Sequence, residues 1–482
     1  MNMRRFLIFI ILFSPVVFAA AQVTNPPSLG EGQGVGLSEL LDSAMQHNMG
    51  IRSAQLDIDA AHQQRREAFT KYFPTVSGTA LTFNANRGMA KMDIDPQEFI
   101  PSSFAATLSQ MLPPEMLVGL SSPISMSMMK NGTIASLMAM QPVFAGGQIV
   151  NGNRLARVGE EASRLQLRLK ENEVERQVAE YYWQLVSLDE KTRTLDAVDS
   201  LLADIYKDVE VAVRAGVALR NDLLQVQLRQ NDIESQRLKL QNAQEVLSLM
   251  LAQYCGITTL PLHLPLREGS IYSQGKVSVK EQSSSSQNDI EAELSTSLPQ
   301  REGLGEGLSL LPEYQLLEKQ VEATRLQQKM AVGKQLPTVA VGAGYNYHNL
   351  LDNDRTFAMV FATVSVPISD WWGGSHAIKR RKIEVQKAEE QLHDNAQLLT
   401  IRMQKARNDV AEARQQLLLA QRGIEQAEEN LRLNRDRYRA GTSTMSNLLE
   451  AQLLSQQSRD KFTDAYADLQ LRLIDLRHAT GQ

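Results

Sequence analysis

The fold is decided by a segment that occurs twice, first as Arg214-Ala215-Gly216 with Leu223-Leu224-Gln225-Val226-Gln227, and then as Arg439-Ala440-Gly441 with Leu448-Leu449-Glu450-Ala451-Gln452. One shift of 225 residues relates the two copies. The same shift carries Pro142 onto Pro367 and Gly256 onto Gly481. Landmarks that share a single shift predict an internal duplication.

The upstream parts of the two copies also correspond. Phe73-Pro74-Thr75-Val76 resembles Leu336-Pro337-Thr338-Val339 at a shift of 263, so the first copy holds 38 extra residues between its two prolines. Proline cannot continue the helices predicted at about 37–71 and 311–334. Each copy therefore predicts a helix, two strands, a very long helix, a glycine turn and a returning helix.

The long helices are predicted to form coiled-coil seams, because apolar residues recur at alternating steps of four and three. The second copy does so at Leu399, Met403, Ala406, Val410, Ala413, Leu417, Ala420, Ile424, Ala427 and Leu431. The first copy does so from Val174 to Val209, with Thr192 as its polar position. A helix over 148–213 would be about 100 Å long. We therefore expect a bundle or a tube rather than a globule.

The strands alternate with a period of two, as in Val339, Val341 and Ala343 against Thr338 and Ala340. Such segments of about ten residues suit a tilted bilayer crossing. A soluble hairpin with one buried face is the alternative. Two strand pairs on an exported chain with very long helices favour a membrane β-barrel. Four strands cannot close a barrel in lipid, so two chains or three must combine.

The first residues predict export. Residues 1–21 have the layout of a secretory signal peptide, with arginines, an apolar run and Ala19-Ala20-Ala21 before Gln22. The net charge of −5 gives no indication of nucleic-acid binding. The single cysteine, Cys255, excludes an intrachain disulfide. Neither HExxH, GxSxG nor P-loop spacing occurs, so we expect no enzyme and no cofactor.

The expected organisation follows from these features. Residues 22–258 form the first structural repeat, 259–310 a low-complexity linker or equatorial region, and 311–482 the second structural repeat. Nine of the 18 methionines lie between Met89 and Met140. Thioethers favour Cu(I), but the spacing is irregular, so the insert at about 87–130 is interpreted as an external loop without a metal site.

In this ordered set of features the chain resembles the TolC family of outer-membrane efflux proteins. The resemblance covers nearly all of the mature chain. It implies a homotrimer with a 12-stranded β-barrel in the outer-membrane lipid of a Gram-negative bacterium, above a helical barrel in the periplasm. It also implies an exit duct for efflux or type I secretion, which docks to a periplasmic adaptor (membrane fusion protein) and an inner-membrane pump.

The resemblance places functional residues at the two turns. The adaptor would meet Gly216-Val217-Ala218-Leu219 and Gly441-Thr442-Ser443-Thr444. The family closes this end with an acidic ring and polar links between helices. The matching gate positions are Asp222, Tyr438, Asn447 and Glu450, the first two as links and the last as a ring acid. Asn447 stands where another ring acid is often found, and Ser443 replaces a linking arginine.

Two further interpretations stay open at this level. An exported coiled-coil structural or adhesin-type protein would share the heptads, but it would not need alternating strands at matched places. The run Lys379-Arg380-Arg381-Lys382, near Trp371-Trp372, suits a periplasm-facing membrane surface or a plain solvated helix face.

Overall fold

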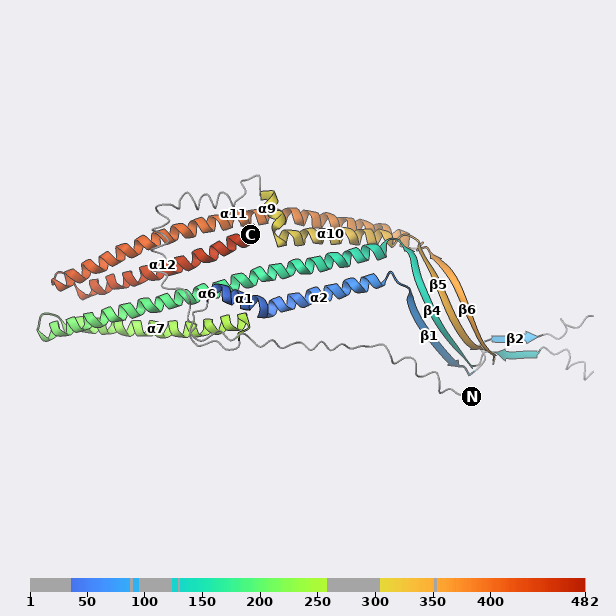
Figure 1. The fold of residues 1–482 in the computed structure, drawn as a ribbon, viewed down its shortest axis with the longest axis horizontal. Coiled ribbons are helices and arrows are strands. Elements are labelled where there is room, and N and C mark those ends of the chain that lie inside the picture. Colours follow the sequence, from blue (N-terminus) through green and yellow to red (C-terminus); the bar gives the residue numbers. More distant parts are fainter. Residues whose placement is uncertain are drawn as a thin grey trace, which may run out of the picture.

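The computed structural model describes residues 36–86, 90–94, 124–128, 131–257, 304–350, 353–368 and 370–481. The predicted signal peptide at 1–21 lies outside the described residues, as do most of the segment 259–310 and most of the methionine-rich insert. The described molecule is elongated and mostly helical, with a small sheet at one end (Figure 1). No helix among the described residues is both long and apolar enough to cross a membrane.

The helices fall into two similar sets, in agreement with the predicted duplication. The first set is α1 (Leu37–His47), α2 (Met49–Thr70), α6 (Gln148–Arg214) and α7 (Arg220–Cys255). The second set is α9 (Leu304–Leu310), α10 (Pro312–Gly333), α11 (Asp370–Arg439) and α12 (Met445–Thr480). The helix predicted over 148–213 is confirmed with one additional residue.

The single helix predicted over 37–71 is wrong, because Asn48 divides it into α1 and α2. The side chain of Asn48 accepts a hydrogen bond from Gly50 N at 2.8 Å, which caps the start of α2. Its Nδ2 donates to the carbonyl of Tyr254, also at 2.8 Å. The break therefore ties the start of α2 to the end of α7.

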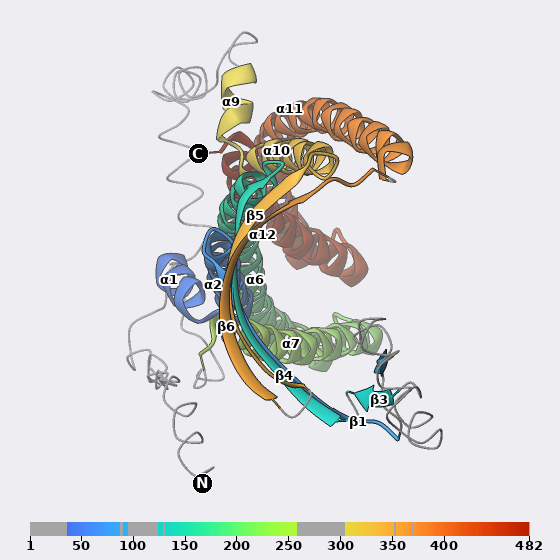
Figure 2. The same cartoon turned by 90° about the vertical axis from the view of Figure 1, so that its right-hand side faces the viewer.

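A four-stranded antiparallel sheet joins the two sets. Its order is β1 (Thr75–Asn84), β4 (Asn131–Ala145), β5 (Thr338–Leu350) and β6 (Asn353–Ser365). Figure 2 shows that these strands curve together as one layer. Pro142 lies inside β4, and the register with β5 shifts between Pro142 and Phe144. Within the insert, β2 (Ala90–Ile94) pairs with β3 (Ile124–Met128).

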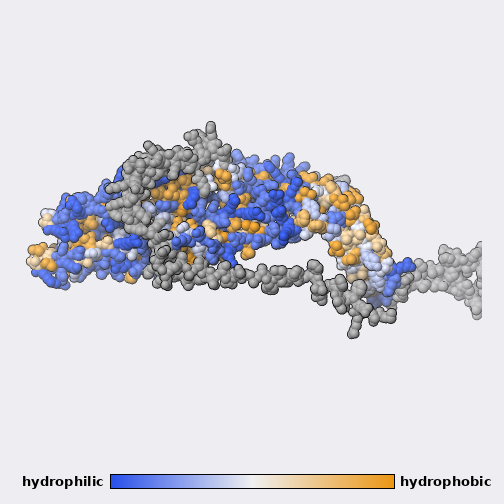
Figure 3. Space-filling model, in the orientation of Figure 1, coloured by the Kyte–Doolittle hydropathy of each residue, from blue (hydrophilic) through white to orange (hydrophobic). Residues whose placement is uncertain are grey.

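The two faces of the sheet differ in composition. The strand registers place mainly aliphatic residues and tyrosine on one side, with Gln141, Thr82, Thr133 and Thr356 toward its two ends. We call this side the apolar face: Val76, Ala80, Leu137, Ala139, Val341, Ala343, Tyr345, Ala358, Val360, Ala362 and Val364. The other side, the mixed face, interleaves Ser77, Thr79, Ser136, Asn346, Thr363 and Ser365 with methionine and phenylalanine. The apolar face is open, since Val360 is 85% exposed and Val364 is 67% exposed. Figure 3 shows hydrophobic residues gathered over the sheet.

The coiled-coil seams are confirmed as the core. In α11 the seam residues Met403 and Val410 are 2% and 1% exposed, and in α6 Val174 and Leu202 are fully buried. Thr192, the polar seam position, donates to the carbonyl of Leu188 at 2.9 Å. The Thr192 hydroxyl also accepts a hydrogen bond from Gln244 Nε2 of α7 at 3.4 Å, so this polar position links α6 to the neighbouring helix.

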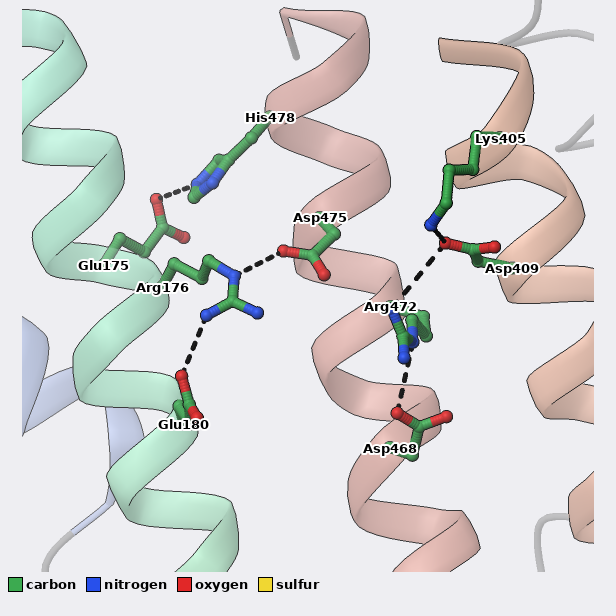
Figure 4. A network of polar contacts seen from close by, with 9 residues as sticks. All are labelled: Glu175, Arg176, Glu180, Lys405, Asp409, Asp468, Arg472, Asp475 and His478. Carbon is green, nitrogen blue, oxygen red and sulfur yellow. Dashed lines mark hydrogen bonds and ion pairs between the residues drawn. The ribbon is translucent and has the colours of Figure 1, made fainter. Parts of the chain in front are cut away.

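Ion pairs bind α12 to both long helices near the middle of the molecule (Figure 4). Arg176 of α6 donates to Asp475 of α12 at 2.8 Å, and His478 of α12 lies 3.0 Å from Glu175 of α6. On the other side of α12, Arg472 pairs with Asp409 of α11 at 3.7 Å. Burial alone would lower the pKa of Arg176, but the neighbouring carboxylates outweigh it and raise that pKa.

Candidate functional site

The turn between α6 and α7 lies at the end of the molecule farthest from the sheet (Figure 1). The predicted stop at Gly216 has φ 75°, and Val217 N bonds the carbonyl of Ala212 at 2.9 Å, a glycine-terminated helix end. Val217 and Leu219 then project to solvent, with 80% and 70% of their surface exposed.

The turn between α11 and α12 lies beside the first but has different chemistry. Gly441 has φ 71°, and Thr442 donates from both its N and its Oγ1 to the carbonyl of Arg437. Thr444 caps α12 by accepting from Asn447 N at 3.3 Å. The two tips are thus apolar in one case and hydroxyl-rich in the other.

Two of the predicted gate residues lie near one another within the chain. Burial raises the pKa of Tyr438, and the charges of Asp222 and Asp208 raise it further. Asp222 also accepts a hydrogen bond from Leu219 N at 3.3 Å. It is therefore a capping residue of α7 as well as a neighbour of the tyrosine.

The other two predicted gate residues lie on α12 and do not join this pair. Asn447 is exposed, and its Nδ2 donates to Ser443 Oγ at 3.3 Å. Ser443 thus bonds within its own turn. Glu450 is exposed one turn further along the helix.

Sequence reasoning missed a buried polar cluster behind the tips. Arg229 of α7 donates to Gln452 at 3.0 Å and to Gln456 at 2.8 Å, and both glutamines lie on α12. Gln456 in turn donates to Gln236 at 3.0 Å. Gln452 and Gln456 are 1% and 5% exposed. Burial lowers the pKa of Arg229. The position of Gln452 in the duplicated segment was the sequence feature that could have indicated this cluster.

Metal and thiol chemistry finds no support in the described part of the chain. Its histidines, cysteine and carboxylates form no group of three that could hold a metal ion. Burial raises the pKa of Cys255 to about 12, so its thiol stays protonated and unreactive.

The described fold is that of solved outer-membrane channels, although sequence identity is low. CusC matches at 14% identity with a TM-score of 0.70, over 95% of this chain and 98% of that chain. MtrE of Neisseria gonorrhoeae matches at 16% identity and 0.67, over 95% and 94%. VceC of Vibrio cholerae matches at 14% identity and 0.67, over 92% and 96%.

The family model described as outer membrane efflux protein matches residues 308–482, which contain α10, β5, β6, α11 and α12. This match and the shared fold confirm the resemblance to the TolC family. No curated protein matches the chain by sequence.

Proposed function

We propose that the chain is one subunit of an outer-membrane channel of a tripartite efflux or type I secretion system. The carrying observation is the match of residues 308–482 to the outer membrane efflux protein family within a chain-long channel fold. In this proposal three copies close their four-stranded sheets into a twelve-stranded barrel. The long helices then form the tube in the periplasm.

The surfaces of the sheet support a position in lipid. The apolar face is exposed along all four strands. Its two central rows, which run from Val76 to Val360 and from Gly78 to Ala358, carry only the Tyr345 hydroxyl as a polar group. An aliphatic, solvent-exposed face is costly in water, whereas lipid accommodates it. The rival, an exported coiled-coil rod, gives no reason for such a face.

Conductance and assembly test the proposal. Purified protein in a planar lipid bilayer should give ion-conducting steps, and outer-membrane fractions should give a heat-sensitive trimer band on gels. A soluble periplasmic rod without conductance would reject the channel.

The tips are proposed to dock the periplasmic adaptor, through which an inner-membrane pump delivers its substrates. Three chains would present six sites of two alternating kinds, because the Val217 and Leu219 tip is apolar and the Thr442 and Ser443 tip is hydroxyl-rich. Cysteine cross-linking from Ser443 should capture the adaptor in cells.

Glu450 is proposed to form an acidic ring at the periplasmic entrance. Three converging carboxylates would favour cations at the mouth of the tube. Glu450→Gln should therefore lower the cation preference in single-channel recordings. Glu245→Gln, the same change at an exposed residue of α7 far from the tip, should leave it unaltered. An unchanged preference in Glu450→Gln would remove the ring from the proposal.

A further inference from the structure

A basic pocket lies where α2 and α6 approach the sheet. Its volume is about 470 Å³, and four arginines contribute to its wall: Arg65, Arg66, Arg154 and Arg157. None of its described lining residues is acidic. This absence of carboxylates within the wall suits an anion.

Two of these arginines are already paired with acids beside the pocket. Arg65 lies 3.2 Å from Glu160, and Arg157 lies 3.0 Å from Glu161. These pairs hold the two guanidinium groups in place and use part of their charge.

The other two arginines carry the surplus charge of the basic pocket. Arg66 and Arg154 are exposed, and neither forms an ion pair with any residue that the structure describes. One comes from each helix, so a phosphate between them could be held from two sides. Guanidinium groups bind phosphate oxygens in a bidentate manner.

The basic pocket opens on the side of the apolar face. Tyr72 lines the pocket, and its carbonyl accepts a hydrogen bond from Gln141 Nε2 at 3.1 Å. Gln141 pairs with Val341 and so projects to the apolar side of the sheet. A separate groove lies against a different side of α2, and it reaches the mixed face of the sheet at Thr75 and Met140.

Aromatic rings separate the basic pocket from the sheet. Phe69 and Tyr72 are 55% and 40% exposed, and Phe69 packs edge-on against both Tyr72 and Phe73. Exposed aromatic residues between an apolar surface and cations are typical of the headgroup region of a bilayer.

The second set of helices repeats the two unpaired cations. The shift of 225 residues carries Arg154 onto Lys379, and the shift of 263 carries Arg66 onto Lys329. Both lysines are exposed and form no ion pair with the described residues. The duplicated fold thus places a similar pair of positive charges at the same level below its second pair of strands.

We propose that the basic pocket binds the phosphate of a membrane glycerophospholipid, whose acyl chains then lie along the apolar face of the sheet. This inference rests on the proposed position in the outer membrane and adds a specific lipid site to it.

Lipid titration of the purified full chain tests the pocket. Palmitoyl-oleoyl phosphatidylglycerol is added to the protein in a neutral detergent, and bound lipids are counted by native mass spectrometry. Removing two cations by Arg66→Gln with Arg154→Gln should weaken lipid binding about 30-fold. The matched pair Arg52→Gln with Arg422→Gln, which removes two exposed arginines outside the pocket, should bind as the unmodified protein does.

Two results would overturn the proposal. The first is equal lipid binding by the two double variants. The second is displacement of the lipid by an equal concentration of inorganic phosphate, which would make the basic pocket a site for free phosphate. Conductance is recorded on the same samples. Its absence in the unmodified protein would reject the channel, whereas normal conductance with unaltered lipid binding would reject the pocket alone.

Discussion

Arg229 of α7 donates from its Nε to Gln452 Oε1 of α12 at 3.0 Å. The two residues come from different helical hairpins and are 223 positions apart. Gln452 is 1% exposed, so this hydrogen bond lies inside the wall that the two hairpins form together. It holds the hairpins in register just behind their tips.

Arg229→Ala should lower the free energy of unfolding by about 2 kcal/mol, because it leaves the buried acceptors of Gln452 and Gln456 unpaired. The melting temperature in detergent, followed by far-ultraviolet circular dichroism, measures this loss. The same variant should conduct more ions in the absence of an adaptor, since the hairpins can separate.

Arg422→Ala is the matched control for that change, because Arg422 is exposed on α11. It should alter the melting temperature little. An equal loss in both variants would show that helix charge, rather than the buried cluster, sets the stability.

Gly216→Ala and Gly441→Ala should each lower the free energy of unfolding by about 1–2 kcal/mol, because both glycines have positive φ. An added Cβ would meet nothing within 4 Å at either position. The cost is thus one of backbone conformation alone. Gly423→Ala, inside α11 and equally uncrowded, should instead stabilise the protein by up to about 1 kcal/mol. Melting temperatures of the three variants decide, and a loss in Gly423→Ala would contradict the argument.

The sequence predicted the elements whose cause is local. Helix periodicity located α6 and α11, and the glycine stops located both tips, because helix ends depend on a few neighbouring residues. The seam residues Met403 and Val410 are buried as their spacing predicted.

The features that escaped prediction depend on contacts distant in the chain. Asn48 ends α1 because its side chain reaches Tyr254, 206 residues away. Arg229 and Gln452 have no spacing that reveals their contact. At the tips, Asp222 caps its own helix through Leu219 N, a role that a gate assignment from resemblance did not include.

Gly333→Ala should lower the free energy of unfolding by about 3 kcal/mol, because the added methyl group has no room. A Cβ at Gly333 would collide with the carbonyl oxygen of Gly146, at the place where the end of α10 meets the start of α6. Gly152→Ala is the control, because its Cβ would meet Met330 at an ordinary 3.8 Å. The midpoint of urea unfolding measures both, and similar midpoints would show that the backbones can move apart.

Asp460 should make the stability depend on pH. Burial raises the pKa of Asp460 from its ordinary 3.8 to about 6, Lys191 opposes the rise, and Asp464 adds to it. The folded state therefore binds more protons than the unfolded chain between these two pH values. The free energy of unfolding therefore falls as the pH rises through that interval. Above about pH 6 the folded state bears the full cost of holding the charged Asp460 carboxylate.

Asp460→Asn removes the half-buried charge and should stabilise the protein at pH 7.5 by about 1–2 kcal/mol, because solvent screens part of the cost of the partly exposed carboxylate. Near pH 4 the gain should vanish, because the unmodified carboxyl is then protonated in the folded state. Melting temperatures across this range test the prediction, with the exposed Asp59→Asn as a control that should give no such trend. A gain for Asp460→Asn that stays constant from pH 4 to 7.5 would show that packing, rather than proton uptake, is responsible.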